Sequence, residues 1–189
     1  MTAETQNRIE QLSALGFRLE CGPPSGQVDN SGEKAWPHIA YTVTLFHDSK
    51  KLLVTDYKLG IGHVEIRAVK FNFGTCGLLT TDEDSMARAW QRNPHASFKD
   101  KQLQAEVAAK LARQQNVSPN LADVLHSLLL DGEAFFNGET FEEWASNFGY
   151  DTDSRKAEEI FKACDLIGRQ LNKVPCGVLN KAREITQDM

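Results

Sequence analysis

From Pro37 to Tyr57 the chain alternates between apolar and polar positions with a period of two, which is typical of β-strands with one buried face. In HIAYTVTLFH one face of the predicted strand consists of Ile39, Tyr41, Val43 and Leu45. The residues that alternate with them are His38, Ala40, Thr42 and Thr44. The polar run Asp48 to Lys51 predicts a turn, and residues 52–57 predict the returning strand. The stretch therefore predicts a β-hairpin with one apolar face.

A hairpin alone is marginal in water, so this one needs a third strand or a helix across it. Phe17 to Cys21 predicts that third strand, in a small antiparallel sheet. Residues 22–34 (GPPSGQVDNSGEK) predict a loop, because they are rich in Gly, Pro, Asn and Ser. Residues 59–79 are apolar but broken by glycines, and they are compatible with an irregular strand or with a partner-binding loop.

Elsewhere the apolar period and the cap residues indicate helices. Thr2 predicts the cap of a helix over residues 3–14, which ends before Gly16. Ser118-Pro119 predicts the start of a helix that reaches Leu130, and Thr140 to Glu143 form a capping box whose helix ends at Gly149. Further helices are predicted over residues 82–91, after a Ser97 cap, and over 154–173. The apolar stripe predicted after Ser97 is Leu103, Val107, Ala108 and Leu111.

These elements predict an α+β fold, in which a small antiparallel sheet of a hairpin plus one strand packs against about six helices. The C-terminal half is mostly helical. A chain of 189 residues with 41% hydrophobic residues can bury one good core, so residues 1–189 are expected to form a single domain.

Composition narrows the function only slightly. The net charge of −5, from 26 acidic and 21 basic residues, argues against a dedicated nucleic-acid binder with a basic face. The cysteines have no pair at metal-ligand spacing, so we expect no metal and no cofactor. They are Cys21, Cys76, Cys164 and Cys176. The opening MTAETQNRIEQ has no apolar core, and no apolar run has the length of a membrane span, so a cytoplasmic protein is expected.

The polar run from Asp151 to Lys156 is compatible with a helix start, a metal loop or a catalytic pair. A carboxylate just before a helix accepts amide hydrogens and faces the positive end of the helix dipole, which favours Asp153 as the N-cap and Ser154 as its competitor. Arg155 stands where a calcium loop needs an oxygen ligand, which weakens the metal interpretation.

The string FEEWASNFGYDTDSRKAEEIFKAC (141–164) resembles the C-terminal signature of small uncharacterised phage and prophage proteins. The hairpin YTVTLFHDSKKLLVTDYKLGIGH and the helix NLADVLHSLLLDGEAF resemble their other parts. The resemblance covers residues 37–63 and 118–173, so residues 64–117 are expected to be an insertion. Such genes often lie among phage accessory functions that include inhibitors of bacterial defence, such as anti-CRISPR proteins.

The resemblance implies a stoichiometric inhibitor of a host protein or ribonucleoprotein, for example a CRISPR effector, in the bacterial cytoplasm, and not an enzyme. Its contact surface is predicted on the insertion, which combines a basic helix with apolar residues. The predicted binding residues are Lys99, Lys101, Lys110, Arg113, Phe71 and Phe73. One alternative is a nucleic-acid-associated protein that uses these cations with Trp36 and His38. Another is a small enzyme that works through Asp151, Asp153 and Arg155.

Overall fold

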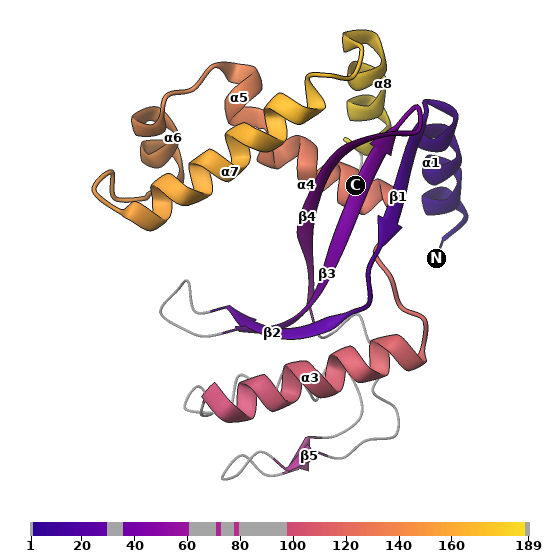
Figure 1. Ribbon diagram of the computed structural model, residues 1–189, viewed down its shortest axis with the longest axis vertical. Coiled ribbons are helices and arrows are strands. Elements are labelled where there is room, and N and C mark those ends of the chain that lie inside the picture. Colours follow the sequence, from indigo (N-terminus) through magenta and orange to yellow (C-terminus); the bar gives the residue numbers. More distant parts are fainter. Residues whose placement is uncertain (1, 30–35, 61–70, 73–77, 80–97, 188–189) are drawn as a thin grey trace. The chain divides into compact units, whose positions relative to one another are not determined.

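The computed structural model describes residues 2–29, 36–60, 71–72, 78–79 and 98–187 (Figure 1). These residues are both helical and β-stranded, and the predicted α+β class is confirmed. The chain divides into two compact units. Unit 1 comprises Met1–Glu20, Thr44–Val54 and Asn120–Met189, and unit 2 comprises Cys21–Val43 and Thr55–Pro119. The predicted family-like core and the predicted insertion do not coincide with these units, and that division stays a prediction.

The four-stranded sheet is organised around its longest strand. This strand, β3 (Trp36–His47), pairs with β1 (Phe17–Cys21), β2 (Ser25–Asp29) and β4 (Lys50–Gly60). The hairpin β3–β4 and the third strand β1 confirm the sequence prediction. The predicted inward residues Ile39, Tyr41, Val43 and Leu45 are all buried.

Strand β2 lies inside residues 22–34, so the prediction of a loop there was wrong. It pairs antiparallel with β3, in a register that runs from Ser25 opposite Ala40 to Asp29 opposite Trp36. The sequence SGQVD has little intrinsic preference for a strand. The pairing with β3 supplies the backbone hydrogen bonds, because β-propensity mostly reflects such neighbours.

In unit 1 the helix α4 (Leu121–Asp131) contacts α1 (Ala3–Ala14), α5 (Glu133–Asn137), α7 (Arg155–Leu171) and α8 (Cys176–Thr186). Helix α6 (Phe141–Phe148) packs against α7. The Thr2 cap of α1 and the positive φ of Gly16 after it confirm the prediction. Ser118 is not the cap of α4. Asn120 holds that place, because its side chain accepts the Asp123 amide at 3.0 Å.

Helices α5 and α7 approach closely at two glycines. A β-carbon on Gly168 would lie 2.3 Å from the β-carbon of Phe135, and one on Gly132 would lie 3.1 Å from the α-carbon of Gly168. Only residues without side chains allow this distance between the backbones. The crossing positions α7, which begins at the polar run of the sequence motif.

In unit 2, helix α3 (Phe98–Gln114) packs on β2 (Figure 1). Its buried apolar face consists of Ala105, Ala108, Ala109 and Ala112, whereas Leu103 is 49% exposed, so the predicted stripe was wrong at that position. The reason is the short distance to the strand, since a β-carbon on Gly26 would lie 2.3 Å from the backbone of Ala105. Larger side chains do not fit there. Strands β5 (Phe71–Asn72) and β6 (Leu78–Leu79) pair antiparallel. The predicted helix over 82–91 and the Ser97 cap lie outside the described residues.

Candidate functional site

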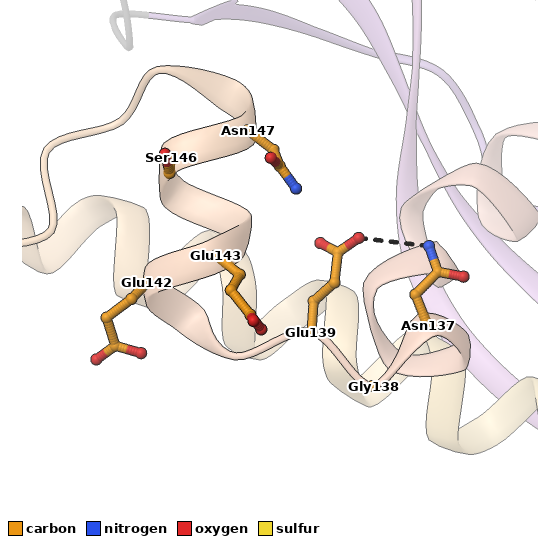
Figure 2. A pocket seen from close by; sticks show the side chains of 7 residues that line it. All are labelled: Asn137, Gly138, Glu139, Glu142, Glu143, Ser146 and Asn147. Carbon is orange, nitrogen blue, oxygen red and sulfur yellow. Dashed lines mark hydrogen bonds between the residues drawn. The ribbon is translucent and has the colours of Figure 1, made fainter.

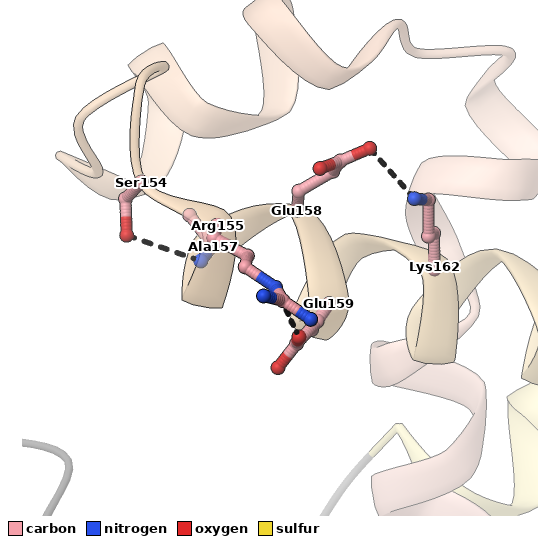
Figure 3. Close-up of polar contacts among 6 residues, drawn as sticks. All are labelled: Ser154, Arg155, Ala157, Glu158, Glu159 and Lys162. Atoms are coloured by element: carbon pink, nitrogen blue, oxygen red, sulfur yellow. Dashed lines mark hydrogen bonds and ion pairs between the residues drawn. The ribbon is translucent and has the colours of Figure 1, made fainter.

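The polar run before α7 is a helix start capped by its serine. Ser154 is the N-cap, and its hydroxyl accepts the Ala157 amide at 3.3 Å (Figure 3). The prediction that Asp153 caps this helix was therefore wrong. Asp151 instead accepts the backbone amide of Asp153 at 3.0 Å, which closes a turn of the Asx type. Because α7 begins at Arg155, the residue immediately before it holds the cap position, and Ser154 has the extended backbone that a cap requires.

The charged side chains of α7 pair along the helix. Arg155 binds Glu159 at 3.2 Å, and Lys162 binds Glu158 at 2.6 Å (Figure 3). Lys162 lowers the pKa of Glu158 through this hydrogen bond and its charge. Arg155, which the enzyme alternative pairs with Asp151 and Asp153, thus contacts a carboxylate one turn further along its own helix. Exposed pairs of this type contribute little to stability, because solvent screens both charges.

An aromatic cluster joins α6, the turn after it and α7. Trp144 is 5% exposed, and four rings surround it. The centroid distances from Trp144 are 5.1 Å to Tyr150, 5.3 Å to Phe148, 5.6 Å to Phe161 and 6.4 Å to Phe141. Tyr150 stacks almost parallel to the indole, at 9°. Two members of the cluster face solvent, because Phe148 is 66% and Tyr150 is 43% exposed.

The backbone at the end of α6 holds Tyr150 over Trp144. Gly149 has a left-handed φ of 69°, and the Tyr150 amide donates to the Ala145 carbonyl at 2.8 Å. This is the hydrogen bond that closes a helix in the Schellman arrangement. At the other end, the predicted capping box is confirmed, since Thr140 and Glu143 satisfy one another's backbone amides. The exposed rings therefore lie at the C-terminal end of a short helix with both ends capped, since Phe148 is its last residue and Tyr150 follows the Gly149 cap.

Carboxylates occupy the opposite face of α6. An open depression of about 680 Å³ is lined by Asn137, Gly138, Glu139, Glu142, Glu143, Ser146 and Asn147. Figure 2 shows Asn147 of α6 and Glu139 of the preceding link pointing toward the same hollow. The backbone amide of Thr140 donates to Glu143 at 2.8 Å, and this bond lowers the pKa of Glu143. Glu143 is thus ionised at neutral pH.

The predicted binding residues do not form one exposed cationic face. Lys101 is 7% exposed, and Arg113 donates from its guanidinium to the Pro24 carbonyl at 2.7 Å, within unit 2. Lys110 is exposed. The side chains of Lys99 and Phe71, and the whole of Phe73, lie outside the described part of the chain.

The two residues of the nucleic-acid alternative have different positions. His38 is 7% exposed in β3, opposite Gln27 of β2. Trp36 lies opposite Asp29 at the start of the same strand, and its side chain is outside the described set. His38 is thus buried at the β2–β3 pairing.

The described residues offer neither a metal-binding group nor a membrane-spanning helix. Among them, no group of three or more His, Cys, Asp or Glu side chains has a geometry for a metal ion. No helix in the described ranges is long and apolar enough to cross a membrane. Burial and the nearby charge of Asp131 raise the pKa of the half-buried Cys164 thiol to about 11, so this thiol is protonated at neutral pH.

Sequence reasoning treated residues 141–150 as structural and missed the exposed rings. Residues 114–154, which include these rings, contain eight Asp and Glu but no Lys or Arg. No protein-family model, curated protein or solved structure shows significant similarity to this chain.

Proposed function

We propose that this chain is a phage or mobile-element accessory protein that binds a host protein or ribonucleoprotein stoichiometrically and inhibits it in the bacterial cytoplasm. The contact is made by the aromatic surface, which we define as Phe148 and Tyr150 with Trp144 beneath them. The observation that carries the binding function is the exposure of two large rings at the C-terminal end of α6, a helix that is capped at both ends. The phage setting rests on the resemblance of the 141–164 motif.

Exposed aromatic rings of this kind suit a protein interface. Tyrosine, tryptophan and phenylalanine are enriched at interfaces, and a few such side chains usually contribute most of the binding energy. Because Tyr150 is already stacked on Trp144 and the Tyr150 amide is already bonded, little conformational freedom is lost when a partner docks. A preformed aromatic anchor supports stoichiometric binding.

The charge around this surface favours protein over nucleic acid as the partner. Asp151 follows Tyr150 directly, Asp153 lies two residues further along the chain, and both are exposed. Carboxylates repel phosphates, so a nucleic-acid partner would have to bind elsewhere. On α3, Lys101 is buried and the Arg113 guanidinium is hydrogen-bonded to the Pro24 carbonyl. Among the α3 side chains that the structure describes, Lys110 is the one cation that is exposed and has no partner.

The test compares two variants in which serine replaces an exposed apolar side chain. Phe148→Ser removes an exposed ring of the aromatic surface, and Leu166→Ser removes another exposed apolar side chain, 56% accessible on α7. Tagged wild type and both variants are incubated with bacterial lysate, and captured proteins are quantified by mass spectrometry. We expect a defined partner, at fixed stoichiometry by native mass spectrometry, that Leu166→Ser retains and Phe148→Ser loses. If both variants retain the same proteins as wild type, the proposal is wrong.

A further inference from the structure

Asn137 is the one asparagine of the chain that a glycine follows. We infer that Asn137 is a site of spontaneous modification, at which the asparagine converts to aspartate and isoaspartate without an enzyme. The inference is independent of the proposed function, because it depends on the covalent chemistry of the peptide bond between Asn137 and Gly138 and on the space around that bond.

The reaction passes through a cyclic imide. The backbone nitrogen of Gly138 attacks the side-chain carbonyl carbon (Cγ) of Asn137, and the bond from Cγ to Nδ2 breaks. Ammonia leaves with the proton that the Gly138 nitrogen carried. Water then opens the ring: cleavage at Cγ gives aspartate, and cleavage at the backbone carbonyl carbon gives isoaspartate, whose main chain runs through the former side chain. Glycine favours the first step, because it has no β-carbon to hinder the approach of its nitrogen.

The structure leaves this peptide bond accessible. Both residues are exposed, and both line the depression beside α6 (Figure 2). Gly138 has a left-handed φ of 68°, and a β-carbon added to it would meet no atom within 4 Å. The Asn137 side chain stays close to the link between α5 and α6, because it donates a hydrogen bond to Glu139 at 3.3 Å. The open space at Gly138 permits the backbone rotation that brings its nitrogen to Cγ.

One hydrogen bond opposes the reaction. The Gly138 amide donates to the Phe135 carbonyl at 3.2 Å, and this bond must break before the nitrogen attacks. It closes the end of α5, a helix of five residues, and the end of so short a helix opens at little cost in free energy. Because this opening is local, the reaction does not require the chain to unfold.

Asp131 and Gly132 form a second pair that can close the same ring. Here Gly132 is buried, its amide donates to the Leu128 carbonyl at 3.0 Å, and an added β-carbon would lie 3.1 Å from the α-carbon of Gly168. Rotation of this peptide bond would push α7 away from the end of α4. Tertiary packing therefore protects Asp131, whereas Asn137 lies at the surface.

Both products change the link between α5 and α6. Each places a new carboxylate in the depression that Glu139, Glu142 and Glu143 already line, and each removes the amide that donates to Glu139. Isoaspartate also lengthens the main chain by one carbon, shortly before the capping box at Thr140. Modified molecules therefore differ from new ones in charge and in the geometry of this link.

The experiment ages the full wild-type chain at mildly alkaline pH in water enriched in a heavy oxygen isotope. Mass spectrometry of the digested chain locates the incorporated isotope, and electron-transfer fragmentation distinguishes isoaspartate from aspartate. Asn147 is the internal control, because it is exposed on the same depression but is followed by Phe148. The matched variant is Asn137→Gln, whose longer side chain forms a larger and less favourable ring.

We expect Asn137 to convert at least about tenfold faster than Asn147, which corresponds to a barrier lower by about 1.4 kcal/mol. Both isoaspartate and aspartate should form, and Asn137→Gln should abolish the label at this position. Asp131 should form isoaspartate in the urea-unfolded chain but not in the folded chain. The rate at Asn137 should not rise with urea below the unfolding transition, because a local opening exposes little surface.

The inference is overturned if Asn137 and Asn147 convert at the same rate. It is also overturned if Asn137 converts in the unfolded chain and not in the folded one, since the hydrogen bond to Phe135 then protects it. A rate at Asn137 that rises with urea in proportion to the unfolded fraction has the same meaning, because the unfolded chain is then the reacting species.

Discussion

Replacing Gly168 with alanine tests the packing that holds the helices of unit 1 together. The new methyl carbon would lie 2.3 Å from the β-carbon of Phe135, 2.8 Å from its γ-carbon and 2.9 Å from the Gly132 carbonyl oxygen. Carbon atoms in contact pack at about 3.5–4.0 Å, so α5 and α7 must separate by about 1 Å. A β-carbon and a backbone oxygen cannot rotate away, and the whole helix must therefore move.

The magnitude follows from two opposing terms. Overpacking of a close contact costs about 1–3 kcal/mol, and the better helix propensity of alanine returns about 1 kcal/mol. Since the clash involves atoms close to the backbone, we expect the overpacking cost to be about 3 kcal/mol, the upper end of its range. The free energy of unfolding should then fall by about 2 kcal/mol, because the helix propensity of alanine offsets about 1 kcal/mol. A loss of this size lowers the urea midpoint by about 1 M and the melting temperature by about 4–8 °C.

The assay is urea denaturation followed by far-UV circular dichroism, with hydrogen exchange of peptides from α5 and α7 to locate the effect. The matched control is Gly177→Ala in α8, where an added β-carbon meets nothing within 4 Å. We expect this control to be as stable as wild type or slightly more stable. If Gly168→Ala is also as stable as wild type, α5 and α7 do not approach through Gly132 and Gly168, and the packing argument is refuted.

Three further results are expected. Ser154→Ala should lower the free energy of unfolding in urea by about 1 kcal/mol, the usual effect of a lost N-cap, while Asp153→Ala should change it by no more than about 0.5 kcal/mol. At pH 8, timed iodoacetamide labelling with peptide mass spectrometry should modify the exposed Cys176 much faster than Cys164, because a pKa of about 11 leaves about one Cys164 thiol in a thousand ionised. The folded-state pKa of Glu143 is lowered, so the contribution of this carboxylate to stability is fully present above about pH 4.5 and is lost as the pH falls further. The urea midpoint of Glu143→Gln should therefore decline less steeply than that of wild type between about pH 6 and 3.

Each of these results has a contradicting outcome. An equal loss in the two cap variants would mean that Asp153 shares the cap with Ser154. Labelling of Cys164 as fast as Cys176 would show that its thiol is neither half-buried nor beside a negative charge. If the urea midpoint of Glu143→Gln falls with pH as steeply as that of wild type, the hydrogen bond from Thr140 does not lower the pKa of Glu143.

Local patterns in the sequence were sufficient to predict the helix ends and the strands that follow one another directly in the chain. The period of two from Pro37 to Tyr57 predicted the β3–β4 hairpin, and Thr2, the capping box at Thr140 and the glycine at 149 predicted helix ends that the structure confirms. The helix ends depend on atoms no more than a turn apart, and the two hairpin strands follow one another directly in the chain, so the pattern itself contains the necessary information.

Tertiary contacts decided the rest. Strand β2 forms because β3 lies beside it, and α3 buries alanines because Gly26 brings the strand backbone close, while its own apolar period would have buried Leu103. The glycine at 149 and the absence of cations over residues 114–154 are visible in the sequence. That Phe148 and Tyr150 remain exposed while Trp144 is buried between α6 and α7 is not, because exposure depends on which neighbouring helix covers each ring.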